Sequence, residues 1–267
     1  MADHYNKFSL KQFAGIVADC MEISLPETFA PGVPWLSKIL KERMGGKADR
    51  AVLYHADAVG LYMWQQYTEL FAPVYQHTSI ALPLLSTLPS VTPVAHASMY
   101  TGLDPEQHGI QAYVRPKLSC VTLYDVLIRA GLHPGIVCFE DSSFTRIFAE
   151  RDMDYYVVDN YTEVRKKVLE LIDKDCYDVL SIHTFDYDTA AHSIGPESKE
   201  AINALAGEAE VFGELAKAIE EKWAGKHRTL ISYSPDHGQH PLEGGGGTHG
   251  SDKIEDMNIV HFFGAKH

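Results

Sequence analysis

The sequence predicts an α/β fold, a single domain with a mostly parallel central sheet flanked by helices. Two observations support this prediction. Short apolar, β-branched runs alternate along the chain with longer amphipathic segments, as they do where parallel strands are joined by helices. The chain has 267 residues, of which 45% are hydrophobic and 22% charged, so it can bury one large core and does not have the composition of a disordered protein.

The predicted elements follow from the length and period of the apolar runs. Strands are predicted where the runs are short, at 50–57, 133–140, 177–185, 228–234 and 258–264. Helices are predicted where apolar residues recur three or four positions apart, at 35–43, 60–75, 118–130, 162–173 and 197–223. Within one domain of residues 1–267, we interpret 1–45 as a helical extension that packs on the sheet or on a partner, and 50–264 as the core of the domain.

The charge of the chain restricts its partners. A net charge of −13 argues against a protein that binds nucleic acid polymers through its surface field. A small anionic substrate remains compatible with this charge if a bound metal supplies positive charge locally. The sequence leaves open whether copies of the chain form a homo-oligomer.

The cysteines and the apolar runs indicate a reducing compartment. The four cysteines are scattered, with no C-x-x-C pair, so we expect buried free thiols rather than disulfides. The N-terminal segment lacks a basic start followed by a long apolar run, and no run reaches the length of a membrane span. We therefore expect a cytoplasmic protein with no membrane partner.

Polar residues cluster where the predicted strands end. Asp57 follows the first strand, Asp186 and Asp188 follow 177–185, and the pair Asp236–His237 follows 228–234. In open parallel sheets ligands bind at the carboxyl ends of the strands. These carboxylates and imidazoles are therefore expected to converge on one site.

The segment "DYDTAAHSIGP" contains the first candidate ligand pair. Asp188 and His192 are four residues apart, so on a helix they share a face and can hold one ion. A surface ion pair would have the same spacing, and Asp186 competes with Asp188 for the carboxylate role. On its own this segment does not decide between these interpretations.

Two further segments supply imidazoles. In "SPDHG", Asp236 and His237 can face one site because the turn after the strand ends its side-chain alternation, although a turn aspartate beside a solvent histidine would have the same sequence. In "GTHGSD", His249 is bracketed by glycines that let the backbone approach a ligand closely. Nitrogen and oxygen donors of this kind are the ones that zinc and neighbouring divalent metals prefer.

The segment "LPSVTPVAHASMYTGLDPEQHGI" contains a candidate nucleophile. Pro93 suits the first position of a helix, which makes Thr92 the N-cap, and Gly102 is expected to end the helix. Thr92 could be a cap and nothing more. The same position also faces the positive end of the helix dipole, which attracts phosphate, and a metal beside the hydroxyl would make it a nucleophile.

Taken together, these motifs resemble a known family. "VTPVAHASMYTGLDPEQHGI", "DTAAHSIGP", "PDHG" and "GTHG", in this order after a strand-end aspartate, are similar to the alkaline phosphatase superfamily, and within it to the type I phosphodiesterase/nucleotide pyrophosphatase-like family. The resemblance spans about residues 50–252 and implies two divalent ions. One ion would be held by Asp188, His192 and His249. The other would be held by Asp57, Asp236, His237 and the nucleophile oxygen of Thr92.

The chain departs from the family pattern at two positions. Ala58 follows Asp57 where the family usually has glycine, and Ala95 stands where an asparagine usually contacts a phosphoryl oxygen. The segment before the last histidine is also reduced to a short glycine loop. The substrate contacts expected instead are the histidines His55, His96 and His240, of which the last could equally be a plain loop residue.

The resemblance implies a hydrolase of phosphodiester or pyrophosphate bonds in a small, nucleotide-like substrate. Thr92 would be the nucleophile, and the cofactors would be two zinc ions, with manganese as the alternative. A phosphomonoesterase, mutase or phosphonate hydrolase would use the same metals, and a metal-binding protein without turnover would fit Ala95 and the short loop. A sulfatase would need a C-x-P-x-R motif, which none of the cysteines provides.

Overall fold

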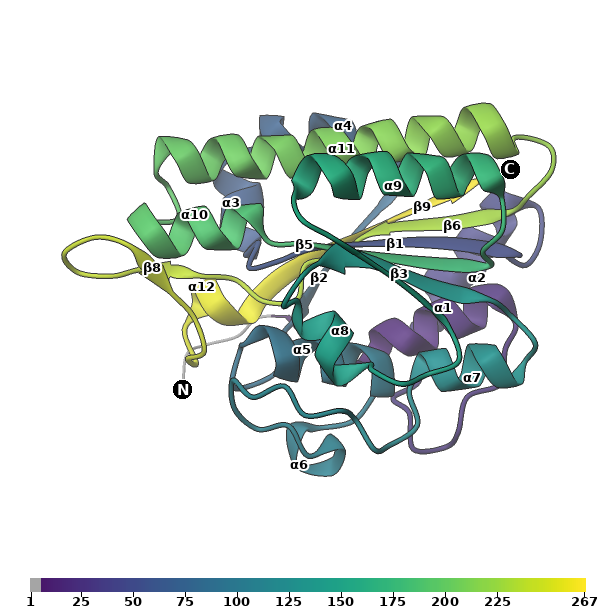
Figure 1. The fold of residues 1–267 in the computed structure, drawn as a ribbon, viewed down its shortest axis with the longest axis horizontal. Helices are drawn as coiled ribbons and strands as arrows, with labels where there is room; N and C mark the ends of the chain where they lie inside the picture. The colour runs from purple at the N-terminus through teal and green to yellow at the C-terminus, as the bar shows by residue number, and fades with distance from the viewer. Residues whose placement is uncertain (1–5) are drawn as a thin grey trace.

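A twisted sheet of seven strands forms the centre of the computed structural model, which describes residues 6–267 (Figure 1). In the order β2-β9-β6-β1-β5-β3-β4, every described strand of this sheet except β9 runs in the same direction. The strands are β1 (Arg50–Ala56), β2 (Ile80–Leu85), β3 (Pro134–Phe139), β4 (Asp154–Val158), β5 (Val179–Thr184), β6 (Thr229–Tyr233) and β9 (Asn258–Lys266). The predicted single-domain α/β fold with a mostly parallel sheet is confirmed.

The sequence revealed the central strands but not two strands at the edges. The predicted strand segments match β1, β3, β5, β6 and β9 to within two residues at each end, whereas β2 and β4 of this sheet were missed. Pro83 lies within β2, and a proline is tolerated in a strand mainly at a sheet edge, where one N–H needs no partner. The short β4 alternates between exposed and half-buried residues and lacks the continuous apolar run of a central strand.

Helices cover both faces of the sheet (Figure 1). One buried cluster lies under α1 (Phe13–Met21), α2 (Pro34–Met44), α5 (Thr92–Thr101), α7 (Leu123–Arg129) and α8 (Ser143–Ile147). The other lies under α3 (Leu61–Gln66), α4 (Ala72–Tyr75), α9 (Tyr161–Lys174), α10 (Asp186–Ile194) and α11 (Lys199–Trp223). Shorter elements are η1 (Leu10–Gln12), η2 (Thr68–Phe71), α6 (Pro105–His108) and α12 (Ile254–Met257). No helix within residues 6–267 is long and apolar enough to cross a membrane.

The segment interpreted as a helical extension contributes to the first of these clusters. Phe13 of α1 and Leu36 and Leu40 of α2 are buried together with Leu53 of β1 and Leu230 of β6. Residues 1–5 lie outside the described part of the chain. The described part of 1–45 therefore packs directly on the sheet.

Two predicted helices differ from the observed ones by more than two residues, whereas the other three match α2, α9 and α11 to within two. The segment 60–75 divides into α3, η2 and α4, because Tyr67 has a non-helical backbone (φ −121°, ψ 44°) and Pro73 cannot donate a backbone hydrogen bond. The predicted helix 118–130 begins only at Leu123, where Thr122 and Asp125 form a reciprocal capping box. In both cases local side chains and dihedral angles override the apolar period.

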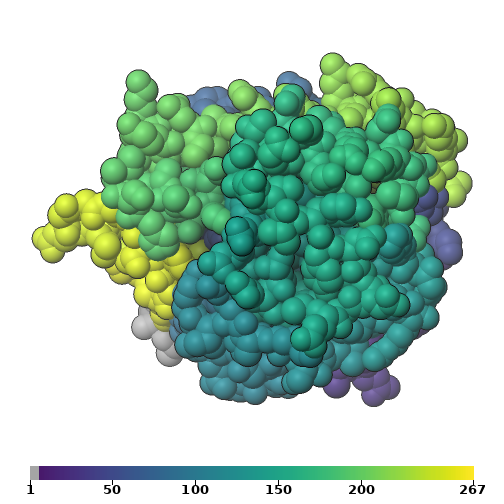
Figure 2. Space-filling view, in the orientation of Figure 1, coloured from purple at the N-terminus to yellow at the C-terminus, as the bar shows by residue number. Residues whose placement is uncertain are grey.

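The carboxyl ends of three neighbouring strands meet at one edge of the sheet. Ala56 at the end of β1 pairs with Thr184 at the end of β5, and Tyr54 pairs with Tyr233 at the end of β6. The Asp57 N–H continues this ladder by donating to the Thr184 carbonyl at 2.9 Å. The residues that follow these strands are therefore brought together. The hairpin of β7 (His240–Pro241) and β8 (Gly247–Thr248) lies at the same end, and its loop projects from the molecule (Figures 1 and 2).

Candidate active site

Two clusters of candidate ligands lie at these strand ends. Within each cluster, one ligand atom from every residue lies within 4.8 Å of the others. The first cluster consists of Asp188, His192 and His249, and the second of Asp57, Asp236 and His237. The rings of His237 and His249 stack with their centroids 4.1 Å apart, so the two clusters adjoin.

The first cluster combines one helix with the loop after β8. Asp188 and His192 occupy successive turns of α10, and His192 Nε2 lies 3.3 Å from Asp188 Oδ1. His249 Nε2 approaches the same oxygen at 3.8 Å. Gln239, which the sequence did not reveal, donates its side-chain N–H to that oxygen at 2.7 Å. Asp186, the competing carboxylate, belongs to neither cluster.

The second cluster is almost completely buried. His237 Nε2 lies 3.4 Å from Asp57 Oδ1 and 3.4 Å from Asp236 Oδ2. Asp236 Oδ1 accepts the backbone N–H groups of Ala58 (3.2 Å) and His237 (2.9 Å). Its other oxygen, Oδ2, has no hydrogen-bond donor among the described residues. A buried carboxylate oxygen without a donor is costly unless a cation neutralises it.

The orientation of the three imidazoles indicates metal ligation. Each ring contacts a backbone carbonyl through Nδ1: His192 contacts Gly247 (2.9 Å), His237 contacts Gly238 (3.1 Å) and His249 contacts Ser90 (2.9 Å). A carbonyl only accepts, so Nδ1 carries the proton and Nε2 presents a lone pair. These lone pairs face carboxyl oxygens, an arrangement that is repulsive unless the carboxyl is protonated or a cation lies between them. Both clusters therefore fit a divalent ion such as zinc, whose histidine ligands are held in this way.

The titration behaviour of the ligands agrees with this interpretation. Burial raises the pKa of Asp236 to about 7 and that of Asp188 to about 6, and it raises the pKa of Asp57 well above its usual value. Burial also lowers the pKa of His237 to about 4 and that of His249 to about 2. Without cations the site thus favours neutral side chains, and bound cations would stabilise the ionised carboxylates.

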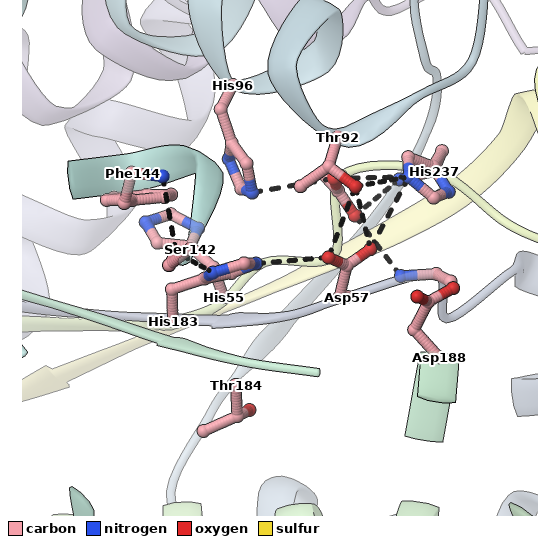
Figure 3. A network of polar contacts seen from close by, with 12 residues as sticks. His55, Asp57, Thr92, His96, Ser142, Phe144, His183, Thr184, Asp188 and His237 are labelled. Atoms are coloured by element: carbon pink, nitrogen blue, oxygen red, sulfur yellow. Dashed lines mark hydrogen bonds and ion pairs between the residues drawn. The ribbon is translucent and has the colours of Figure 1, made fainter. Parts of the chain in front are cut away.

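Thr92 lies directly against the second cluster (Figure 3). Its Oγ1 is 3.2 Å from Asp57 Oδ2 and 3.3 Å from His237 Nε2. The predicted helix start is off by one residue: Val91 is the N-cap, because its carbonyl accepts the first backbone bonds, and Thr92 is the first residue of α5. No side chain caps this helix, so the Thr92 hydroxyl is not a capping group and faces the ligands instead. Gly102, in the left-handed conformation at φ 66°, ends the helix as predicted.

His183 supports the second cluster from within β5 (Figure 3). Its Nε2 donates to Asp57 Oδ2 at 3.2 Å, and its Nδ1 accepts from the Ser142 hydroxyl at 2.8 Å. The ring is buried and both nitrogens are used, which fits the usual role of a histidine in a central strand. His183 therefore orients the Asp57 carboxylate.

The three histidines expected to contact substrate are not among the described residues that line the cavity beside Thr92. Both nitrogens of His55 are used in the core, by the Ser234 carbonyl and the Tyr100 hydroxyl. His96 is fully buried, with its Nε2 3.4 Å from an oxygen of Asp236. His240 Nδ1 lies 2.6 Å from Asp256 Oδ1 at the base of the β7–β8 hairpin.

A cavity of about 720 Å³ opens beside the two clusters. Its lining includes the candidate site residues Asp57, Thr92, Asp188, His192 and His249. Tyr113, Arg115, Glu140, Asp141 and Phe185 also line it. A second cavity, of about 620 Å³, lies around Gly45 and Lys47, before the start of β1, and contains none of the candidate ligands.

The glycine loop has a geometric explanation. Gly244, Gly245 and Gly246 all have positive φ angles, between 79° and 108°, which other residues adopt only with strain. At Gly247 a Cβ atom would lie 2.3 Å from Gln239 Oε1, so no larger residue fits without displacement. The loop needs these glycines to bring the Gly247 carbonyl onto His192 and to place His249 across the cavity.

Ala58 also adopts a left-handed conformation, with φ 63°. Glycine takes this conformation freely, whereas alanine pays about 1–2 kcal/mol for it. The left-handed backbone at this position thus explains why the family usually has glycine where this chain has Ala58. The conformation turns the Ala58 N–H toward Asp236, so the site keeps this geometry despite the cost.

The fold and the site together describe an α/β protein with a mostly parallel sheet, two clusters of candidate metal ligands and an adjacent threonine, as the motifs predicted. Residues 58–126 match the type I phosphodiesterase/nucleotide pyrophosphatase family, which confirms the resemblance. The match includes Thr92 and precedes the ligands of α10 and the β7–β8 hairpin. No curated protein sequence matches the chain.

Similar solved structures share the fold. Mouse ectonucleotide pyrophosphatase/phosphodiesterase 5, solved as an inactive threonine-to-alanine variant in complex with AMP, is 16% identical with a TM-score of 0.59 over 74% of this chain and 59% of that one. Phosphonoacetate hydrolase from Sinorhizobium meliloti, solved with phosphonoformate, is 15% identical with a TM-score of 0.53 over 72% of this chain and 57% of that one. This chain thus spans less than three-fifths of the length of either structure.

Proposed function

We propose that the chain is a metal-dependent hydrolase that cleaves phosphodiester or pyrophosphate bonds of a small, nucleotide-like substrate, with Thr92 as the nucleophile. The observation that carries this proposal is the position of the Thr92 hydroxyl, which touches Asp57 and His237 and is not used to cap its helix. The family match, which includes Thr92, supports the same activity.

The two ligand clusters would each hold one divalent cation, zinc or else manganese. Asp188, His192 and His249 would hold one, and Asp57, Asp236, His237 and Thr92 the other. Such a pair supplies positive charge that stabilises both the attacking and the leaving oxygen of an in-line displacement.

The residues of this chain prepare the threonine and the phosphoryl group for reaction. The Thr92 hydroxyl donates a hydrogen bond to Asp57 Oδ2 (Oγ1 to Oδ2, 3.2 Å), and a hydrogen bond from His183 holds that carboxylate in place. Thr92 begins a helix of 10 residues, whose dipole favours a phosphate at its N-terminal end. Ala95 is buried in the same helix and offers no side-chain donor to a phosphoryl oxygen. Stabilisation of that oxygen therefore depends on the two clusters.

An ester comparison tests this function. Protein loaded with zinc or with manganese is assayed on bis-p-nitrophenyl phosphate and on p-nitrophenyl phosphate, with p-nitrophenolate release as the readout. Faster cleavage of the diester supports the proposal, and faster cleavage of the monoester supports a phosphomonoesterase on the same scaffold. Stoichiometric metal binding without turnover of either ester would identify a metal-binding protein and contradict the proposal.

A further inference from the structure

Arg115 gives the lining of the cavity a cationic group beside its candidate metal ligands. Among the described residues that line the cavity, Arg115 is the only lysine or arginine, while Glu140 and Asp141 add negative charge near it. A single guanidinium in the lining of this cavity has two possible roles. It can be the counterion of a neighbouring carboxylate, or it can bind a ligand.

The neighbouring carboxylate already has a closer cation. Asp141 Oδ1 lies 2.9 Å from Arg146 Nη2 but 3.8 Å from Arg115 Nη1. The hydrogen bond from Arg146 is the largest cause that lowers the pKa of Asp141, and Arg115 contributes less. Arg146 does not line the cavity. Asp141 therefore does not require Arg115 as its counterion.

The guanidinium of Arg115 is hydrogen-bonded through one of its nitrogens. Its Nη1 donates to the backbone carbonyl of Asp141, and within residues 6–267 no hydrogen bond from its other nitrogens is found. Guanidinium has five N–H donors in a planar fork that matches the two oxygens of a carboxylate or phosphate. Since the Arg115 side chain is 32% exposed, its unused donors are only partly solvated and are accessible from the cavity.

The segment that carries Arg115 lies within electrostatic reach of the ligand clusters. Tyr113, two residues before it, has a raised pKa because of burial and then of the negative charge of Asp57, with a further contribution from Asp188. Tyr113 and Arg115 line the same cavity as Thr92. A volume of about 720 Å³ is in the range of sites that bind whole small molecules, so one substrate in this cavity can contact both Thr92 and Arg115.

We propose that Arg115 forms a second anion subsite, so that the preferred substrate carries a carboxylate or phosphate group in addition to the phosphoryl group attacked at Thr92. This inference rests on the proposed function. A charge-assisted, forked contact of this kind should favour an anionic substrate over its neutral isostere by about 10- to 100-fold.

A matched pair of esters tests the subsite. The substrates are 2-carboxyethyl p-nitrophenyl phosphate and its neutral analogue 2-carbamoylethyl p-nitrophenyl phosphate, and 2-phosphonoethyl p-nitrophenyl phosphate distinguishes a preference for phosphate from one for carboxylate. For the zinc-loaded wild-type protein, kcat/KM should be about 10- to 100-fold higher for the better anionic ester than for the amide. In Arg115→Met this ratio should fall to near one, and Arg115→Lys should keep an intermediate ratio because it retains charge without the fork.

The control variant is Arg146→Met, which removes the other cation bound to Asp141 outside the cavity and should keep the wild-type ratio. A wild-type ratio near one, or an undiminished ratio in Arg115→Met, would overturn the subsite while leaving the hydrolase intact. If the wild-type protein cleaves none of the esters, the proposed function fails, and calorimetry then tests the subsite separately. Zinc-loaded wild-type protein should bind 3-phosphonopropanoate at least 10-fold more tightly than propylphosphonate, and Arg115→Met should not.

Discussion

Replacing Asp236 by asparagine should stabilise the metal-free protein while weakening its response to zinc. The side chain is fully buried, and burial raises its pKa to about 7. An asparagine can still accept the N–H groups of Ala58 and His237 through its oxygen. Its NH₂ group would then replace Asp236 Oδ2, 3.4 Å from the Nε2 atoms of His96 and His237. The substitution therefore exchanges a buried oxygen that lacks a donor for a group that can donate.

The size of the effect follows from the pKa of Asp236. The difference between 3.8 and about 7 corresponds to about 4 kcal/mol at 1.36 kcal/mol per pKa unit. Because the folded state holds this proton more tightly than the unfolded state, the stability of the wild-type protein falls as pH rises from about 4 to about 7. The variant does not lose this stability as pH rises. Removing the charge of Asp236 also removes its repulsion of Asp57, which contributes to the raised pKa of Asp57. Its advantage in unfolding free energy should therefore grow by about 4 kcal/mol across this window.

Urea unfolding in EDTA, at half-unit steps from pH 4.5 to pH 8, measures this advantage. Repeating the series with zinc should reduce the variant's advantage at pH 8 by up to about 2.7 kcal/mol, since zinc at about 100 times its Kd contributes about that much per site and Asp236 belongs to only one of the two clusters. Asp186→Asn, which alters a partly buried carboxylate outside both clusters, should keep the full zinc response. Parallel pH profiles for wild type and Asp236→Asn in EDTA, or equal stabilisation of the two by zinc, would refute the reasoning.

Three further substitutions test separate parts of the site. Thr92→Ala should keep its bound metal, measured by elemental analysis, but its activity should fall by more than about 1000-fold. Thr92→Ser should retain most of the activity. Normal turnover in Thr92→Ala would exclude Thr92 as the nucleophile. His249→Ala should lose metal from one site, and two full equivalents of zinc in this variant would refute its assignment. Gly247→Ala should also lower zinc content, because its Cβ would lie 2.3 Å from the Gln239 side chain; Gly207→Ala, whose nearest neighbouring atom is 3.8 Å away, serves as the control.

The sequence predicted those parts of the fold that local patterns determine. The central strands are short, β-branched and largely apolar runs that are almost fully buried, and long helices such as α11 keep their apolar period throughout, so both could be recognised. The edge strands β2 and β4 depend on pairing with β9 and β3, which no local pattern encodes. The break at Tyr67 depends on a single dihedral angle.

The candidate site was predictable for a different reason. Its ligands follow the ends of adjacent strands, and parallel topology alone brings such positions together. Supporting contacts were not predictable, because Ser142 meets His183, and Gln239 meets Asp188, across separations of 41 and 51 residues. The position of His96 was not predictable either, because its Nε2 lies 3.4 Å from Asp236 across a separation that no local pattern encodes.

Anomalous diffraction at the zinc edge, from crystals of the zinc-loaded protein, tests the central claim most directly. The two clusters should give two peaks about 3.5–4 Å apart, one among Asp188, His192 and His249 and the other among Asp57, Asp236, His237 and Thr92. Peaks elsewhere on the molecule, or no peak in contact with the Thr92 hydroxyl, would contradict the account.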